Sequence, residues 1–149
     1  RRMYMAIYEK MNEYLSNLAV LNVKLHNLHW NVVGLQFVEI HEFTESIYDD
    51  LFEKYDAVAE LIKIKGEKPL VRMVDYLEKA SIKETDKDKF STVEVLEILK
   101  EDLTKMKELA TEIRNLADEA GEFVIVAEFE GHVEGYDKNL WFIEAMLTQ

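Results

Sequence analysis

The sequence predicts an all-α fold, a four-helix bundle with one short extra helix between the second and third long helices. Only 5 glycines and 1 proline interrupt the 149 residues, which favours long helices. Apolar residues also recur at helical spacing along four long stretches, and glycines separate these stretches. Four long helices, each with one apolar face, pack most simply as a bundle. We therefore expect one domain that covers residues 1–149.

The first two long helices are expected over residues 3–33 and 38–64. Gly34 provides the turn between them, because glycine is the residue that most readily breaks a helix without proline. The second helix should stop near Gly66 and Pro69. The apolar positions that define the first helix are Ile7, Met11, Leu15, Leu18, Leu21, Leu25 and Leu28.

The remaining elements follow from shorter signals. An amphipathic segment over residues 70–78 predicts a short helix, and a charged loop follows over residues 83–89. Ser91 or Thr92 should cap the third long helix, because acidic residues follow at the positions of its first turns. This helix should extend to about residue 119. Gly121 then precedes the fourth long helix, which is expected over residues 122–147.

Composition excludes several classes of protein. The formal charge is −12, which argues against nucleic-acid binding, because phosphate contacts need clustered lysine and arginine. The chain has no cysteine, which excludes disulfides and thiolate metal sites. We find no signal peptide and no apolar run of about 18 residues that could span a membrane. We therefore expect a cytoplasmic protein without a membrane partner.

Histidine and acidic residues of the second helix share one stripe. At about 100° per residue from His41, the side chains of Glu45, Asp56 and Glu60 fall within about 100° of it, nearly opposite the apolar residues. Such a stripe is ordinarily a solvated face, because charged residues are mostly exposed. A histidine pair alone is likewise more often structural than metal-binding. The stripe alone therefore does not distinguish a solvated face from a metal site.

Spacing along the hairpin supplies that observation. His29 lies five residues before Gly34 and His41 lies seven after it, so the two imidazoles should come level in an antiparallel hairpin. Asp56 and Glu60 lie about 22 Å further along the helix, too far to share one metal ion with His41. A two-fold axis would bring the two groups together from different chains. Mixed imidazole and carboxylate ligands suit iron, zinc or manganese.

A metal site inside the bundle is not expected. A di-iron site in the core of a four-helix bundle uses Glu-x-x-His pairs, and the sequence contains none. The absence of this motif favours a site shared between subunits.

Taken together, these positions resemble those of the Dps-type miniferritins, the DNA-binding-protein-from-starved-cells family of the ferritin-like superfamily. The resemblance covers nearly the whole chain and implies a ferritin-like bundle that assembles through two-fold dimers into a hollow dodecamer. Two features depart from the family pattern: Glu45 stands where aspartate is more common, and the loop after the second helix is altered. The matching residues are His29-Trp30, Gly34, Phe37, His41-Glu42, Glu45, Asp56 and Ala59-Glu60.

The resemblance also implies a function and an iron site. The family oxidises Fe(II), preferentially with hydrogen peroxide, at ferroxidase sites between subunits, and it stores the Fe(III) mineral, which protects against oxidative damage. By position, His29, Asp56 and Glu60 would be the principal iron ligands. His41 and Glu45 would complete the site or hold a second iron.

Further roles are implied less directly. Trp30 would sit beside the iron and take up oxidising equivalents, although a tryptophan is by default a packing residue. Asp118, Glu122 and Glu128 flank the last helix junction, where the family builds an ion pore. Acidic residues are also favoured at helix N-termini for electrostatic reasons alone, so the pore role and the simpler role both stand.

Two other classes of function compete with iron storage. The family name suggests a nucleoid protein, but we do not expect this acidic sequence to bind DNA unless a basic tail lies outside it. A structural or host-interaction bundle with a vestigial metal site is the second alternative.

Overall fold

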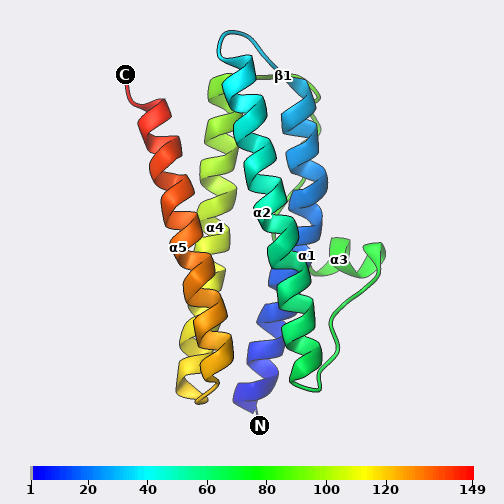
Figure 1. Cartoon of the computed structure of the whole chain (residues 1–149). Coiled ribbons are helices and arrows are strands. Elements are labelled where there is room, and N and C mark those ends of the chain that lie inside the picture. The colour runs from blue at the N-terminus through cyan, green and yellow to red at the C-terminus, as the bar shows by residue number, and fades with distance from the viewer. Residues whose placement is uncertain (1) are drawn as a thin grey trace.

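Residues 2–149 are described in a computed structural model, which shows an elongated bundle of four long helices with a short helix at its side (Figure 1). The expected all-α bundle and the place of the short helix are confirmed. The helices are α1 (Arg2–Asn31), α2 (Phe37–Ile64), α3 (Met73–Lys79), α4 (Thr92–Glu119) and α5 (Phe123–Leu147).

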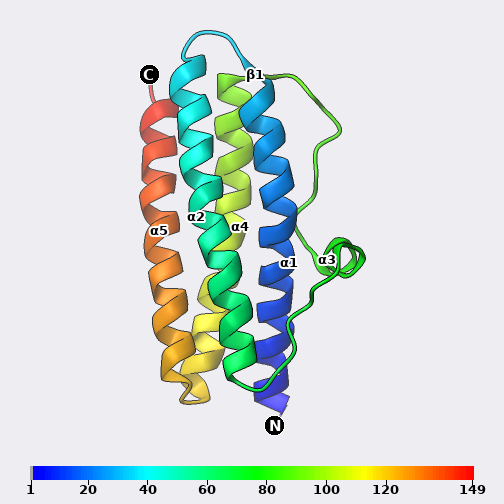
Figure 2. The same cartoon turned by 45° about the vertical axis from the view of Figure 1, so that its right-hand side comes forward.

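Neighbouring long helices in the chain are antiparallel, except where one long connection makes α2 and α4 run in the same direction. Helix α1 runs antiparallel to α2, and α4 runs antiparallel to α5 (Figure 1). Residues 65–91 carry the chain back along the bundle, so α2 and α4 run in the same direction. Helix α3 lies within this connection and packs beside α1 (Figure 2). One long crossover of this kind is a property of ferritin-like bundles.

The first long helix ends earlier than predicted, because a short pair of parallel strands follows it at one end of the bundle. We expected that helix to reach residue 33, but α1 ends at Asn31 and β1 (Val32–Val33) follows. It pairs in parallel with β2 (Phe90–Ser91), with Val32 opposite Phe90. Both side chains of this pair are buried. The pairing therefore fixes the end of the long connection against the end of α1.

The start of α3 also differs from the prediction. The short helix was expected from residue 70 but begins at Met73. The backbone N–H of Leu70 donates to Oδ1 of Asn12 at 2.9 Å, and its carbonyl accepts from the Tyr76 hydroxyl at 2.7 Å. Because α1 and Tyr76 bind the backbone groups of Leu70, that residue serves as an anchor for the loop rather than as a helical residue.

The cap of α4 is confirmed at Ser91. Its hydroxyl accepts from the Glu94 backbone N–H at 3.1 Å, and the Glu94 carboxylate accepts from the Ser91 N–H at 3.0 Å. This reciprocal capping box satisfies two backbone donors that the helix itself leaves unpaired. At the other end of α4, Gly121 has φ of +70°, a conformation that side chains disfavour.

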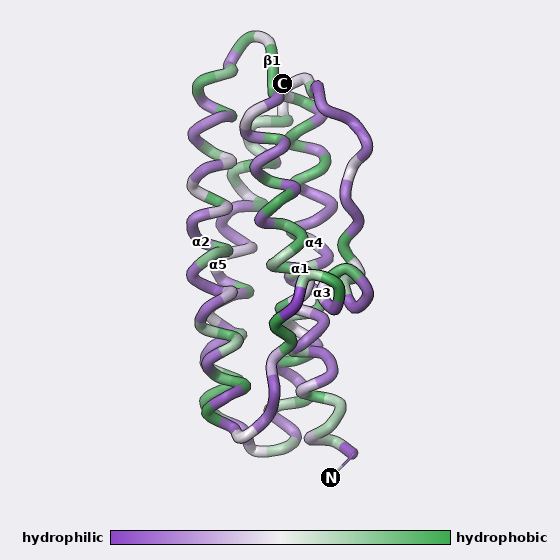
Figure 3. The backbone as a smooth tube through the Cα atoms, turned by 90° about the vertical axis from the view of Figure 1, so that its right-hand side faces the viewer, coloured by the Kyte–Doolittle hydropathy of each residue, from purple (hydrophilic) through white to green (hydrophobic). Residues whose placement is uncertain are grey.

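The core runs the length of the bundle and receives apolar residues from all four long helices. Hydrophobic and hydrophilic residues alternate along each helix, as one buried face and one exposed face require (Figure 3). Within residues 2–149, no helix combines the length and the apolarity that a membrane span needs. The largest side chains that are fully buried include Tyr14, Tyr136, Phe90 and Phe129.

Candidate metal centre

His29 near the end of α1 and His41 in the first turns of α2 lie in contact across the Gly34 turn. Their ring centroids are 3.6 Å apart and their planes differ by 13°. His29 is 5% exposed, and His41 is half-buried. Gly34 has φ of +114°, which allows the tight connection between the two helices. The prediction that the two imidazoles come level is confirmed.

Reciprocal hydrogen bonds fix the protonation of both rings. His29 donates from Nδ1 to the His41 carbonyl at 2.7 Å, and His41 donates from Nδ1 to the His29 carbonyl at 2.8 Å. A carbonyl oxygen can only accept, so each Nδ1 carries a proton. In the neutral ring the lone pair is then on Nε2. Outer hydrogen bonds of this type orient histidines that bind metals.

Burial keeps His29 in the neutral form that binds a cation. Loss of hydration lowers the pKa of His29, against a smaller opposing effect from its hydrogen bond to the His41 carbonyl. Glu45 lies one turn beyond His41, with its Oε1 4.0 Å from Nε2 of His29. This carboxylate is exposed, and it accepts a long hydrogen bond of 3.4 Å from the Tyr48 hydroxyl. The three predicted ligands at this end of the hairpin are therefore neighbours.

Asp56 and Glu60 form a second group on the same outer face of α2. Both side chains are exposed, and they lie one turn apart. The Asp56 carboxylate accepts a hydrogen bond from Glu60 when Glu60 is protonated, and this bond, together with the negative charge of Asp56, raises the pKa of Glu60. A cation placed between the two carboxylates would relieve this repulsion.

The single chain does not bring the two groups together. Asp56 is 15 residues beyond His41, about 22 Å along α2. In the part of the chain that the structure describes, no three histidine, aspartate or glutamate side chains are grouped closely enough to hold a metal ion. We name the first group, His29, His41 and Glu45, the imidazole half-site. The second, Asp56 and Glu60, is the carboxylate half-site.

Aromatic side chains border the imidazole half-site. Phe37 stacks on His41 with centroids 5.1 Å apart, and Tyr48 stacks on His26 at 4.0 Å. Trp30 is 67% exposed and contacts His26 at 5.4 Å between centroids, so it is not a core residue. The sequence alone leaves His26 as either a structural or an adventitious metal-binding residue, and it does not single out Tyr48. The only sequence signal was that these residues lie one helical turn from His29 or Glu45.

The three predicted pore residues each contact a basic group of the same chain. Asp118 lies 3.6 Å from Arg114, and Glu122 lies 2.6 Å from Lys65. Glu128 accepts from His132 at 2.6 Å. The first two carboxylates are near the α4–α5 junction, as expected, whereas Glu128 binds inward to a buried histidine. Their role in an ion pore stays a prediction.

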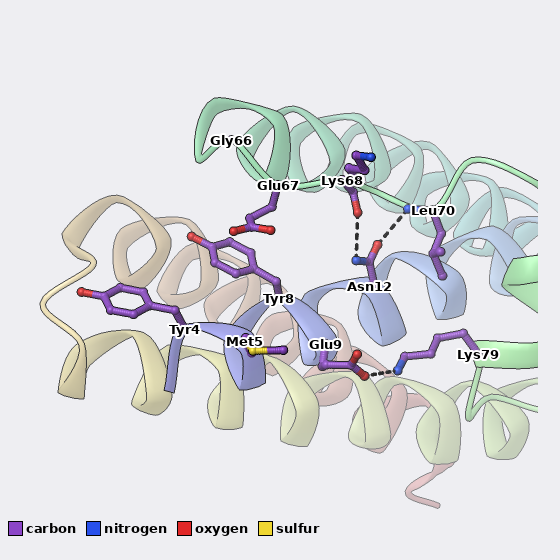
Figure 4. A pocket seen from close by; sticks show the side chains of 10 residues that line it. All are labelled: Tyr4, Met5, Tyr8, Glu9, Asn12, Gly66, Glu67, Lys68, Leu70 and Lys79. Atoms are coloured by element: carbon purple, nitrogen blue, oxygen red, sulfur yellow. Dashed lines mark hydrogen bonds and ion pairs between the residues drawn. The ribbon is translucent and has the colours of Figure 1, made fainter. Parts of the chain in front are cut away.

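A separate hollow of about 560 Å³ lies between the first turns of α1 and the connection after α2 (Figure 4). Asn12 bridges its wall, because its amide donates to the Lys68 carbonyl and accepts from the Leu70 N–H. Lys79 closes one side through an ion pair with Glu9. None of the predicted metal ligands lines this hollow, so the candidate centre is the outer face of the α1–α2 hairpin.

Comparison with known proteins gives consistent matches. The ferritin-like domain family matches residues 8–149. A "DNA protection during starvation protein" of Helicobacter pylori is 30% identical over 144 residues, which cover 97% of this chain and all of the relative. The crystal structure of antigen TpF1 from Treponema pallidum superposes with a TM-score of 0.98 at 28% identity, over 100% of this chain and 96% of that one.

A third similar protein has a solved structure whose description names a class of metal proteins. The Dps protein of Vibrio cholerae is 27% identical, with a TM-score of 0.93 over 99% of this chain and 92% of its own. Its structure is described as that of a member of a broad superfamily of ferritin-like diiron-carboxylate proteins.

Proposed function

The chain belongs to the ferritin-like family as a Dps protein, and on that premise we propose that it oxidises Fe(II) and stores the Fe(III) product. We further propose hydrogen peroxide as the preferred oxidant and a hollow dodecamer as the storage shell. The observation that carries the proposal is the pair of half-sites on one outer face. The imidazole half-site offers two free Nε2 atoms, and the carboxylate half-site offers two adjacent anionic groups.

Two-fold symmetry would complete the centre. If two α1–α2 hairpins pack antiparallel, the imidazole half-site of one copy meets the carboxylate half-site of the other. The same operation creates a second, identical site. Because His41 and Glu45 lie on the same stripe of α2 as Asp56 and Glu60, one packing geometry serves both half-sites. Exposed Trp30 and Phe52, 67% and 62% exposed, lie on this hairpin and would be covered in the dimer.

The ligand set fits the chemistry of iron as substrate. Imidazole and carboxylate groups bind Fe(II), and the anionic oxygens favour Fe(III) once an electron has left. Two Fe(II) ions held together give hydrogen peroxide two electrons, and with two protons the products are two water molecules and two Fe(III) ions. A lone Fe(II) gives one electron and releases a hydroxyl radical. A site for two irons, with His41 and Glu45 beside His29, therefore protects against that radical.

The proposal has a direct test in subunit mixing. The variants His29→Ala and Asp56→Ala should each form shells of normal mass that have lost peroxide-driven oxidation of Fe(II). When the two are unfolded and reassembled together, half of the dimers are mixed, and each mixed dimer has one site with both half-sites intact. About a quarter of the wild-type activity should return.

The mixing experiment distinguishes shared from internal sites. Glu53→Ala, an exposed change on the same helix, is the matched control and should leave the oxidation rate unchanged. If each chain held a complete site, the mixture of the two variants would stay inactive. Parallel assays with dioxygen as the only oxidant test the preference for peroxide.

DNA protection is a second candidate because the relatives carry that name. The formal charge of −12 on each chain opposes it, since an assembled shell would be strongly anionic. We expect no shift of linear DNA in a gel at low salt. A shift that disappears as salt is raised would support direct phosphate contacts and this second function.

A further inference from the structure

A chain of hydrogen-bonded side chains crosses the bundle core at a distance from the imidazole half-site. The Tyr14 hydroxyl of α1 lies 2.8 Å from Nδ1 of His132 and 2.5 Å from the Tyr136 hydroxyl, both on α5. Nε2 of His132 lies 2.6 Å from a carboxylate oxygen of Glu128. Tyr14, His132 and Tyr136 are at most 4% exposed, whereas Glu128 reaches the surface.

The direction of each hydrogen bond follows from the chemistry of the groups. The Glu128 carboxylate accepts, so Nε2 of His132 carries a proton. Burial lowers the pKa of His132, and the nearby ammonium of Lys54 lowers it further, which favours the neutral ring. Nδ1 of that ring must then accept, and Tyr14 donates to it. Tyr136 completes the chain by donating to the Tyr14 oxygen.

Besides Glu128 of α5, the charged groups that face this cluster come from α2. The Lys54 ammonium lies 5.6 Å from the centre of the Tyr136 ring, and it is paired with Asp50. Burial raises the pKa of Tyr14 well above its usual value, so its hydroxyl is protonated. The cluster therefore contains a buried phenol whose proton points directly at a neutral base.

We propose that Tyr14 is a redox-active residue, which gives one electron to one-electron oxidants formed during iron chemistry while His132 accepts its proton. A buried phenol that lost only an electron would leave a positive charge in the core, which is costly. Transfer of the proton to a hydrogen-bonded base avoids that charge. His132 supplies the base, and Glu128 stabilises the imidazolium that forms.

Position in the fold connects Tyr14 to the iron chemistry. His29 and His41 touch across the antiparallel hairpin. Tyr14 lies 15 residues before His29 on α1, and Asp56 lies 15 residues after His41 on α2. Both positions are about 22 Å from the histidine pair, so they lie at the same level of the bundle. Tyr14 lies in the core at this level, and the carboxylate half-site lies on the outer face of α2. This part of the inference rests on the proposed function.

The reaction balances without a further reagent. A hydroxyl radical, released when peroxide meets a single Fe(II), takes one electron and becomes hydroxide. The Tyr14 O–H bond breaks, its proton binds Nδ1 of His132, and the Nε2 proton shifts toward Glu128. A later Fe(II) returns the electron and becomes Fe(III), while the protons move back. The sum is oxidation of one Fe(II) by the radical, with the tyrosine restored.

A second tyrosine pair in the same chain serves as a matched control. The hydroxyls of Tyr55 and Tyr76 lie 2.6 Å apart, but Tyr76 donates to the Leu70 carbonyl, which cannot take up a proton at neutral pH. Tyr55 directly precedes Asp56 in the sequence. The two pairs therefore share a hydroxyl contact and closeness to the carboxylate half-site, and they differ in the presence of a base.

The test begins with iron-free shells and a soluble photo-generated oxidant, tris(bipyridyl)ruthenium(III). Frozen samples are examined by electron paramagnetic resonance for a tyrosyl radical with an exchangeable proton from histidine. We expect this signal in the wild type and in Tyr55→Phe, and its loss in Tyr14→Phe. His132→Gln retains a hydrogen-bond acceptor but not a base, so the radical yield should fall and the exchangeable coupling should vanish.

A second arm uses Fe(II) with hydrogen peroxide and a spin trap for hydroxyl radical. Tyr14→Phe should release more trapped radical than the wild type, and Tyr55→Phe should not. A tyrosyl signal unchanged in Tyr14→Phe, or lost equally in Tyr55→Phe, would overturn the inference. If Fe(II) is not oxidised by any shell, the proposed function fails, while the iron-free arm still decides the role of Tyr14. Should His132→Gln not fold, slower radical formation in deuterated water tests proton transfer in the wild type.

Discussion

At the scale of single residues, His41 has two roles that can be separated from each other. Its Nε2 is a candidate ligand, and its carbonyl accepts from Nδ1 of His29 and so orients that ring. Its own ring stacks on His29 and donates to the His29 carbonyl. The side chain and the backbone of one residue therefore support the imidazole half-site in different ways.

Removal of the His41 ring should weaken metal binding without unfolding the chain. His41→Ala keeps the carbonyl that accepts from His29 but removes a ligand and the stacked ring. We expect affinity for Fe(II) or Zn(II) to fall about 10–100-fold, the range for loss of groups that support a ligand. Titration calorimetry measures this. His26→Ala changes a histidine of the same segment and should leave the affinity unchanged; an equal loss there would contradict the assignment.

A second residue-scale prediction concerns the buried ion pair between Lys24 and Asp102. Their charged atoms are 2.7 Å apart, and Lys24 also donates to the Lys83 carbonyl at 2.7 Å. Burial raises the pKa of Asp102, although the nearby ammonium opposes that effect. Lys24→Met would leave this carboxylate without its partner. We expect a loss of about 3–5 kcal/mol in the free energy of unfolding at pH 7.

The dependence of that loss on pH has a definite sign. An acid with a raised pKa in the folded state costs stability as pH rises through its ordinary pKa, because the folded form holds the proton longer. The loss in Lys24→Met should therefore shrink as the pH is lowered from 7 to 4, because the raised pKa of Asp102 favours protonation of the folded form. Denaturant titrations of variant and wild type at both pH values measure it. A double change to Lys24→Met with Asp102→Leu should recover most of the stability.

At the scale of elements, the turn between α1 and α2 determines whether the imidazole half-site forms. Gly34 has φ of +114°, and a Cβ built there meets no atom within 4 Å. The strain in Gly34→Ala is therefore conformational rather than steric. We expect a cost of about 1–3 kcal/mol in unfolding free energy and weaker metal binding, because the two histidines lose their alignment.

A matched glycine gives the opposite expectation. Gly131 lies within α5 with ordinary helical geometry, and a Cβ there also meets nothing within 4 Å. Gly131→Ala should stabilise the protein by about 0.5–1 kcal/mol. Thermal unfolding of both variants provides the comparison. If both changes had the same sign, backbone conformation could not be the cause at Gly34.

Elements with regular patterns were predictable, and those set by distant contacts were not. Periodic apolar residues located every helix to within a few positions, and the spacing across Gly34 predicted the contact between His29 and His41. The Val32–Phe90 pairing was missed because its valine continues the helical pattern and its partner is remote in sequence. Tyr14 and His132 are 118 positions apart, so no local signal could indicate their hydrogen bond.

At the scale of the whole molecule, the half-sites are useful only if symmetry unites them. In the proposed dimer, the two-fold axis passes between copies of α2, near the midpoint of the two half-sites. Phe52 lies near that midpoint, is 62% exposed, and falls on the same stripe as His41 and Asp56. Aromatic residues are enriched in the buried core of protein interfaces, so we expect Phe52 to lie at the centre of this one.

Phe52→Glu should therefore abolish the centre without changing any ligand. Two carboxylates brought together at the axis, in place of two apolar rings, would oppose dimer formation. We expect a smaller particle mass by light scattering, together with loss of peroxide-driven Fe(II) oxidation and unchanged helical content by circular dichroism. Thr111→Glu places the same charge on the exposed side of α4 and should preserve both mass and activity. If monomeric Phe52→Glu still oxidises Fe(II) at the wild-type rate, one chain is sufficient for the reaction. The site would then not be shared between two subunits.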